Sequence, residues 1–179
     1  MQADFSNPLT NRRESMLKNL RKSDVEGFFE GEFYFSLFKT ETNVFIDMEE
    51  PDIDYINKCI ENLNSLSDEL IDELCVYIIR YCNDFREYFE DEGIEIPENV
   101  TGRQILDYIE PVVLGIEEPD DENIIGYSLE FNVPWEEEHG MEVVIMDNKI
   151  MYVSSYNGVG AWCEDYDDGC NYVLGANLT

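Results

Sequence analysis

The order of hydrophobic and polar positions divides the chain into a strand-like start, a helical middle and a strand-like end. Near the start, two runs rich in aromatic and β-branched residues, "EFYFSLF" and "NVFIDM", flank the polar stretch "KTET". Such runs on either side of a short polar segment predict a β-hairpin.

Apolar residues recur at helical spacing after Pro51, which is well suited to the first turn of a helix. Residues 52–64 form one such stretch. The longer stretch "SDELIDELCVYIIRYCNDFREYFEDEG" begins at Ser67, a good N-cap, and carries a continuous apolar stripe. A third, short helix is predicted at "TGRQILDYI", where Thr101 and Gln104 have the spacing of a capping box.

The pattern returns to strands after Pro111, with "PVVLGI", the alternating "IIGYSLEFNVPW" and the pair within "MEVVIMDNKIMYVSS". Asp147 and Asn148 suit a two-residue turn in that pair, because both tolerate positive φ. The element order predicts an α+β fold: an N-terminal β-hairpin, three helices, and a C-terminal antiparallel β-meander packed on the helices.

Charge separates the N-terminus from the rest. The chain has 41 acidic and 11 basic residues, a net charge of −30. Residues 1–24 hold five basic and three acidic residues and are interpreted as a basic arm that could be flexible, and residues 25–179 as a single domain with a net charge of −32. So acidic a domain repels nucleic acid and anionic lipid and attracts cations or a basic protein. No apolar run is long enough to span a bilayer and the start lacks a secretory signal, so a cytoplasmic location is expected.

The sole histidine, His139, follows Glu136, Glu137 and Glu138. A zinc protease motif needs two histidines on one helix, and here a second histidine is missing and Pro134 and Gly140 bracket a loop. General acid-base catalysis by His139 and its neighbouring carboxylates is one interpretation. A loop between two strands explains the same residues without chemistry.

The C-terminal stretch "CEDYDDGC" is a second acidic loop, between Cys163 and Cys170, which could pair if oxidised. Aligned to a calcium-binding EF-hand loop, it lacks the final bidentate glutamate and has Tyr166 in a ligand position. One histidine and no CxxC pair argue against structural zinc. We therefore predict neither a metal site nor a cofactor.

The segment "LEFNVPWEEEHGMEVVIMDNKIMYV" resembles an uncharacterised bacterial domain family whose members carry a Trp-acidic-His-Gly element between two strands. The likeness covers about the C-terminal half and implies a fold, with no activity attached. In size, acidity and α+β plan the chain also resembles immunity proteins of bacterial toxin systems, which often bind a basic nuclease toxin.

These observations favour a non-enzymatic protein-binding domain that presents an acidic face to a basic protein, with a nuclease toxin as the example. Aromatic residues in loops would anchor such a partner; the alternative is that both tryptophans, and Trp135 in particular, plug the end of the sheet. The candidate partner-binding residues are Trp135, Glu136, Glu137, Glu138, His139, Tyr156, Trp162, Asp165, Asp167 and Asp168. Two alternatives stay open: a small hydrolase or metal-dependent enzyme using His139, and a housekeeping domain whose charge only serves solubility.

Overall fold

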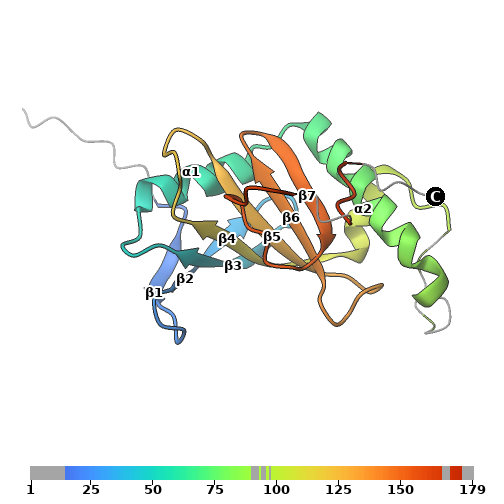
Figure 1. Ribbon diagram of the computed structural model, residues 1–179, viewed down its shortest axis with the longest axis horizontal. Helices are drawn as coiled ribbons and strands as arrows, with labels where there is room; N and C mark the ends of the chain where they lie inside the picture. Colours follow the sequence, from blue (N-terminus) through green and yellow to red (C-terminus); the bar gives the residue numbers. More distant parts are fainter. Residues whose placement is uncertain (1–14, 90–92, 94–95, 97, 167–169, 175–179) are drawn as a thin grey trace, which may run out of the picture.

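The computed structural model describes residues 15–89, 93, 96, 98–166 and 170–174, and contains one seven-stranded sheet with helices on one side (Figure 1). The strands follow one another in the sheet in sequence order. They are β1 (Lys18–Lys22), β2 (Phe29–Phe35), β3 (Thr40–Asp47), β4 (Glu110–Glu117), β5 (Gly126–Asn132), β6 (Met141–Met146) and β7 (Lys149–Ser155). The helices are α1 (Ile53–Asn64), α2 (Asp68–Phe89) and the 3-10 helix η1 (Gly102–Tyr108).

The predicted separation into hairpin, helices and meander is wrong. β2 and β3 do form a hairpin, but β3 continues into the same sheet by pairing with β4, from Asn43 opposite Val113 to Asp47 opposite Glu117. This pair is parallel, whereas every other neighbouring pair in the described sheet is antiparallel. A parallel pair needs a long crossover, and the helices supply it. The fold is therefore one mixed sheet, because β3 and β4 each pair along both edges.

Capping residues and turn residues in the sequence predicted the starts of both long helices and the β6–β7 turn. Asp52 caps α1 through its side chain, which accepts from the amides of Asp54 and Tyr55. Ser67 Oγ accepts from the amide of Leu70 at the start of α2. The β6–β7 turn has φ of 49° at Asp147 and 57° at Asn148, so the predicted turn is confirmed. In the stretch interpreted as a basic arm, residues 18–22 form β1.

The main core lies between the helices and one face of the sheet. Ile56 and Ile60 of α1 and Ile78 of α2 are fully buried against strand residues such as Phe33 and Ile46. Burying each such side chain contributes about 1.5–3 kcal/mol. Packing on this face sets which residues of each strand point away from the helices.

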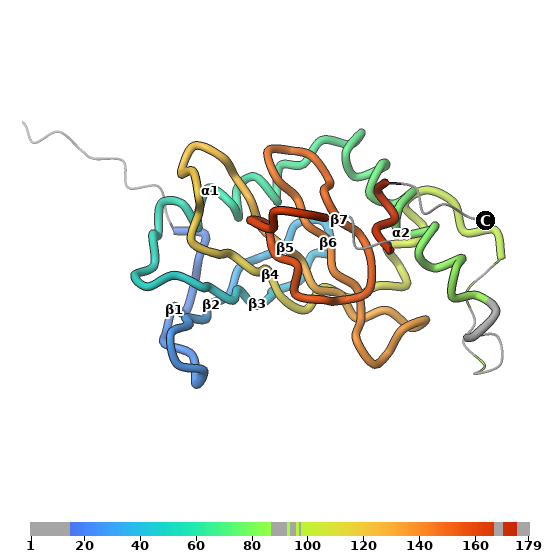
Figure 2. The backbone as a smooth tube through the Cα atoms, in the orientation of Figure 1, coloured from blue at the N-terminus to red at the C-terminus, as the bar shows by residue number. Residues whose placement is uncertain are grey.

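The other face of the sheet is only partly covered. After β7 the chain turns back across the sheet (Figure 2). Ala161 of this segment packs on Val144 of β6 and Tyr152 of β7. The next segment covers the outer edge of β7, because Tyr172 N donates to Val153 O at 3.0 Å and Asn171 Oδ1 accepts from Val153 N. The segment around Ala161 also reaches the start of β5 and the end of β4, because Ala161 and Trp162 lie against Gly126 and Ala161 N donates to Glu117 Oε2.

Candidate functional site

Acidic side chains line the face of the sheet that points away from the helices. In β3, Val44 and Ile46 are buried in the core, so Phe45 and Asp47 point to the opposite face. Neighbouring strands repeat this alternation in register. We define the acidic face as the surface formed by Glu30, Glu32, Glu41, Asp47, Glu117 and Glu130.

Two hollows lie on the acidic face and share Phe45 and Val113. The smaller, of about 140 Å³, is also bounded by Asp47, Glu117, Glu130, Glu142 and Tyr156. The larger, of about 290 Å³, is also bounded by Arg21, Glu30, Glu32 and Asn43. Carboxylates beside aromatic rings in a concave surface are suited to binding cationic side chains.

Glu142 holds the segment that covers one end of this face. Its side chain is 1% exposed. Its Oε2 accepts from the backbone amides of Asn157 and Val159, both at 3.1 Å, and its Oε1 from Gly160 N at 3.2 Å. A buried carboxylate is stable only when such bonds satisfy it, so Glu142 is a structural anchor for residues 157–160.

Glu117 fixes the same segment from β4. Its Oε2 accepts from Ala161 N at 2.8 Å. Gly160 has φ of +68°, and a Cβ there would lie 2.5 Å from Glu117 Oε2. A side chain at this position would therefore push the carboxylate away.

The carboxylate of Glu130 is half-buried in the smaller hollow. Burial raises its pKa, the Tyr156 hydroxyl lowers it by hydrogen bonding, and the nearby charge of Glu142 raises it further. Within the described residues, no ion pair is formed by Glu117, Glu130 or Glu142. An ionised Glu130 thus lies in a hollow where a cation would be strongly favoured.

The cations that do lie on this face come from β1. Lys18 Nζ crosses β2 to reach Glu41 Oε1 at 2.8 Å, and an Arg21 nitrogen lies 2.5 Å from Glu30 Oε2. Both pairs lie on the β2–β3 side, away from Glu130.

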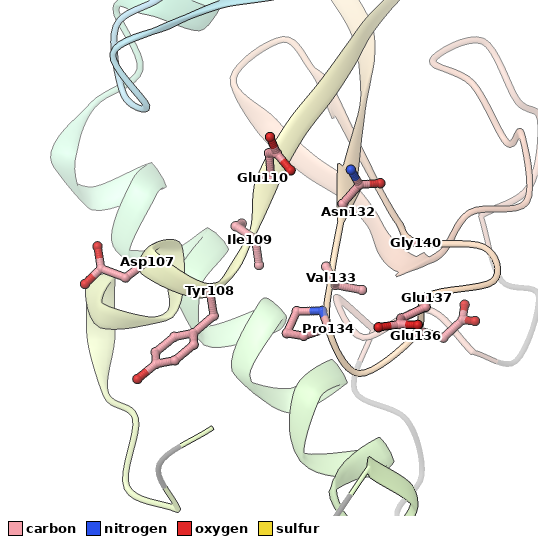
Figure 3. A pocket seen from close by; sticks show the side chains of 10 residues that line it. All are labelled: Asp107, Tyr108, Ile109, Glu110, Asn132, Val133, Pro134, Glu136, Glu137 and Gly140. Carbon is pink, nitrogen blue, oxygen red and sulfur yellow. The ribbon is translucent and has the colours of Figure 1, made fainter. Parts of the chain in front are cut away.

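The predicted loop at residues 135–139 forms a separate region beside a hollow of about 400 Å³ (Figure 3). Glu110 of β4 and Asn132 of β5 border this hollow, together with Glu136 and Glu137 of the loop. Asn132 lies two residues from Glu130 on the same face of β5, so this hollow continues the line of the acidic face.

The structure places the candidate residues of this loop differently from one another. Trp135 is 4% exposed, packs edge-on against the Tyr81 ring, and so belongs to the core. Glu137, Glu138 and His139 are exposed. Only the exposed three can meet a partner without rearrangement.

Glu136 links the loop to the core through both carboxylate oxygens. Its Oε1 lies 3.1 Å from His139 Nδ1, and its Oε2 accepts a short hydrogen bond from Ser155 Oγ. The Tyr81 hydroxyl in turn donates to Ser155 Oγ at 3.2 Å. In a serine hydrolase the imidazole stands between the serine and the acid, whereas here the acid stands between the imidazole and the serine. This order orients the loop and gives Ser155 no imidazole base.

The remaining candidates lie after β7. Tyr156 is 40% exposed and borders the smaller hollow of the acidic face. Trp162 is half-buried over Gly126, and Asp165 is exposed in the loop beyond. Two further candidates, Asp167 and Asp168, lie outside the described residues.

The cysteines fall into two classes. Cys59, Cys75 and Cys82 are buried, and burial raises the thiol pKa of Cys59 to about 12 and of the other two to about 11. Cys163 is partly exposed and Cys170 is exposed.

The described residues contain neither a metal-binding cluster nor a membrane-spanning helix. Their acidic, histidine and cysteine side chains form no group of three that could hold a metal ion. No helix among them combines the length and apolar character needed to cross a membrane.

Comparison with known families gives one match. The model of the family described as "Domain of unknown function (DUF6985)" matches residues 16–160. The chain belongs to this family. No curated protein and no solved structure matches the chain. The matched span contains all seven strands and the whole acidic face, whereas Trp162 and Asp165 lie beyond it.

Sequence reasoning missed the acidic face as a unit, although a signal for it exists. The strands "FEGEFYF" and "GYSLEFN" carry glutamates at positions that alternate with core residues. The polar positions of these strands predict that Glu30, Glu32 and Glu130 lie on the side of the sheet opposite the core. Only the pairing of β3 with β4 brings Asp47 and Glu117 beside them.

Proposed function

We propose that this chain is a non-enzymatic protein-binding domain whose acidic face receives a basic protein, with a nuclease toxin as the specific class of partner. The observation that carries the proposal is the half-buried Glu130, which shares its hollow with two other glutamates and with no cationic partner among the described residues. A lysine or arginine side chain entering this hollow would gain charge-assisted hydrogen bonds.

Charge and shape support the same partner class. A net charge of −32 on residues 25–179 steers a basic protein toward the domain and raises its association rate by about 10- to 1000-fold. Phe45 and the exposed Tyr156 offer aromatic surface beside the carboxylates. Aromatic anchors with surrounding charge are typical of protein interfaces. We further propose that the encounter takes place in the cytoplasm.

The test compares two variants of equal charge. Asp47→Asn with Glu130→Gln neutralises two of the six carboxylates of the acidic face, and Asp54→Asn with Glu69→Gln neutralises two exposed carboxylates on the helical side. Binding of a short arginine homopeptide is measured by calorimetry at several salt concentrations. We expect the face variant to bind about tenfold more weakly, or about 1.4 kcal/mol, and the helical variant to resemble the original chain.

Capture from a cell extract on the same three immobilised proteins then identifies a natural partner. A basic protein held by the original chain and the helical variant, lost from the face variant and released by salt, is the expected result. Equal peptide binding by both variants, or none by any, would contradict the proposal and favour a charge that only serves solubility.

A further inference from the structure

The cationic edge strand β1 already occupies part of the acidic face. Lys18 pairs with Glu41 at 2.8 Å and Arg21 with Glu30 at 2.5 Å. Asn19 Nδ2 adds a hydrogen bond to Glu32 Oε2 at 2.7 Å. Three of the six carboxylates of the face are thus engaged by one short strand of the same chain.

β1 is attached to the rest of the fold at few points. All five of its residues are exposed, and its ladder with β2 is interrupted between Lys18 and Arg21, where Asn19 has φ of +53°. Both ion pairs are exposed, with side-chain accessibilities of 50% and 52% for Lys18–Glu41 and of 66% and 31% for Arg21–Glu30. Pairs this exposed contribute little to stability.

One buried side chain anchors this strand. Leu17 is 7% exposed and fills the space above Gly31, where a Cβ would lie 2.6 Å from Leu17 Cδ1. Asn57 Oδ1 of α1 accepts from Met16 N at 2.8 Å and Leu17 N at 3.2 Å. Leu17 and Asn57 therefore add a buried attachment to the interrupted ladder with β2 and to the exposed side-chain pairs.

We propose that residues 15–22 form a displaceable strap that competes with the basic partner for the acidic face. The inference rests on the proposed function and adds its regulation. Arg21 borders the larger hollow, which shares Phe45 and Val113 with the hollow of Glu130. A cationic segment that enters the smaller hollow and extends along the face therefore meets Arg21, whose guanidinium already pairs with Glu30 and repels a second cation there.

Three variants and the same arginine homopeptide test the strap. Lys18→Gln with Arg21→Gln removes its cations, and Lys58→Gln with Lys149→Gln makes the same charge change at exposed positions on α1 and at the start of β7. Leu17→Ala loosens the strap without changing any charge. Circular dichroism of each variant checks that the remaining fold is intact.

We expect the strap variant to bind the peptide about tenfold more tightly than the original chain, since each released pair contributes about 1.4- to 5-fold. The control variant, Lys58→Gln with Lys149→Gln, should change the affinity for the peptide by less than about threefold, because salt screens charges that lie far from the acidic face. Leu17→Ala should also tighten binding, and hydrogen exchange of the β1 amides should accelerate when the peptide binds the original chain.

The outcomes separate the strap from the proposed function. If the original chain binds the peptide but the strap variant matches its control, or the β1 amides become more protected in the complex, the strap is refuted and the acidic face stands. If no variant binds the peptide, both proposals fail.

Discussion

Replacing Glu142 by glutamine tests whether a buried carboxylate holds the segment over β6. The side chain keeps its size, but one acceptor oxygen becomes an amide nitrogen that can only donate. Three backbone amides point at the carboxylate, two at Oε2 and one at Oε1. The best orientation of the glutamine keeps the oxygen toward Asn157 and Val159 and leaves the amide of Gly160 without an acceptor.

The magnitude follows from these three bonds. Charge-assisted hydrogen bonds contribute about 1 kcal/mol more than neutral ones, so the two retained bonds lose about 2 kcal/mol together. The unpaired amide of Gly160, which is a buried residue, costs about 1–3 kcal/mol. Because glutamine carries no charge to desolvate, part of the loss is offset, and we expect the free energy of unfolding to fall by about 2 kcal/mol.

Urea unfolding followed by circular dichroism measures this change, with Glu138→Gln as the matched control. Glu138 is exposed, and its substitution should stay within about 0.5 kcal/mol of the original chain. Hydrogen exchange adds a local readout, because the amides of Asn157, Val159 and Gly160 should lose protection in Glu142→Gln. Unchanged stability together with undiminished protection of these amides would refute the anchoring role of Glu142.

Other expectations concern the acidic face, the loop after β5 and the thiols. Burial raises the pKa of Glu130 above 4.5, so the free energy of unfolding of the original chain falls as the pH rises through that value. Glutamine has no charge to bury, and Glu130→Gln should therefore be more stable than the original chain at neutral pH. This gain should vanish below about pH 4.5. A less stable variant in neutral urea titrations would contradict this. Trp135→Ala should lower the free energy of unfolding by about 3–5 kcal/mol, whereas His139→Ala should change it by less than about 0.5 kcal/mol. A larger loss for His139→Ala than for Trp135→Ala would contradict the burial of Trp135 and the exposure of His139. Thiol titration of the folded protein should modify Cys163 and Cys170 rapidly and the three helical cysteines only after unfolding, and fast reaction of any helical cysteine would refute their burial.

The functional surface shows where prediction from sequence stopped. The loop at residues 135–139 stood out because acids and the sole histidine are adjacent in sequence. Adjacent residues of a loop need not share an environment, and Trp135 is buried while His139 is exposed. The acids of the face are dispersed over four strands, and their proximity depends on strand order, which no local pattern encodes.

The sequence by itself determined most local elements: both long helices, the turn at Asp147 and Asn148, and the strand runs other than β1, which lies in the stretch interpreted as a basic arm. Spacing of apolar residues, capping side chains and tolerance of positive φ act over a few residues and can be read directly. Only the tertiary structure decided that β3 pairs with β4 across the helices and that Asp47 meets Glu117. That pairing depends on burying the apolar faces of distant segments together. Many arrangements of the same elements satisfy the local patterns, and packing of the whole chain selects one of them.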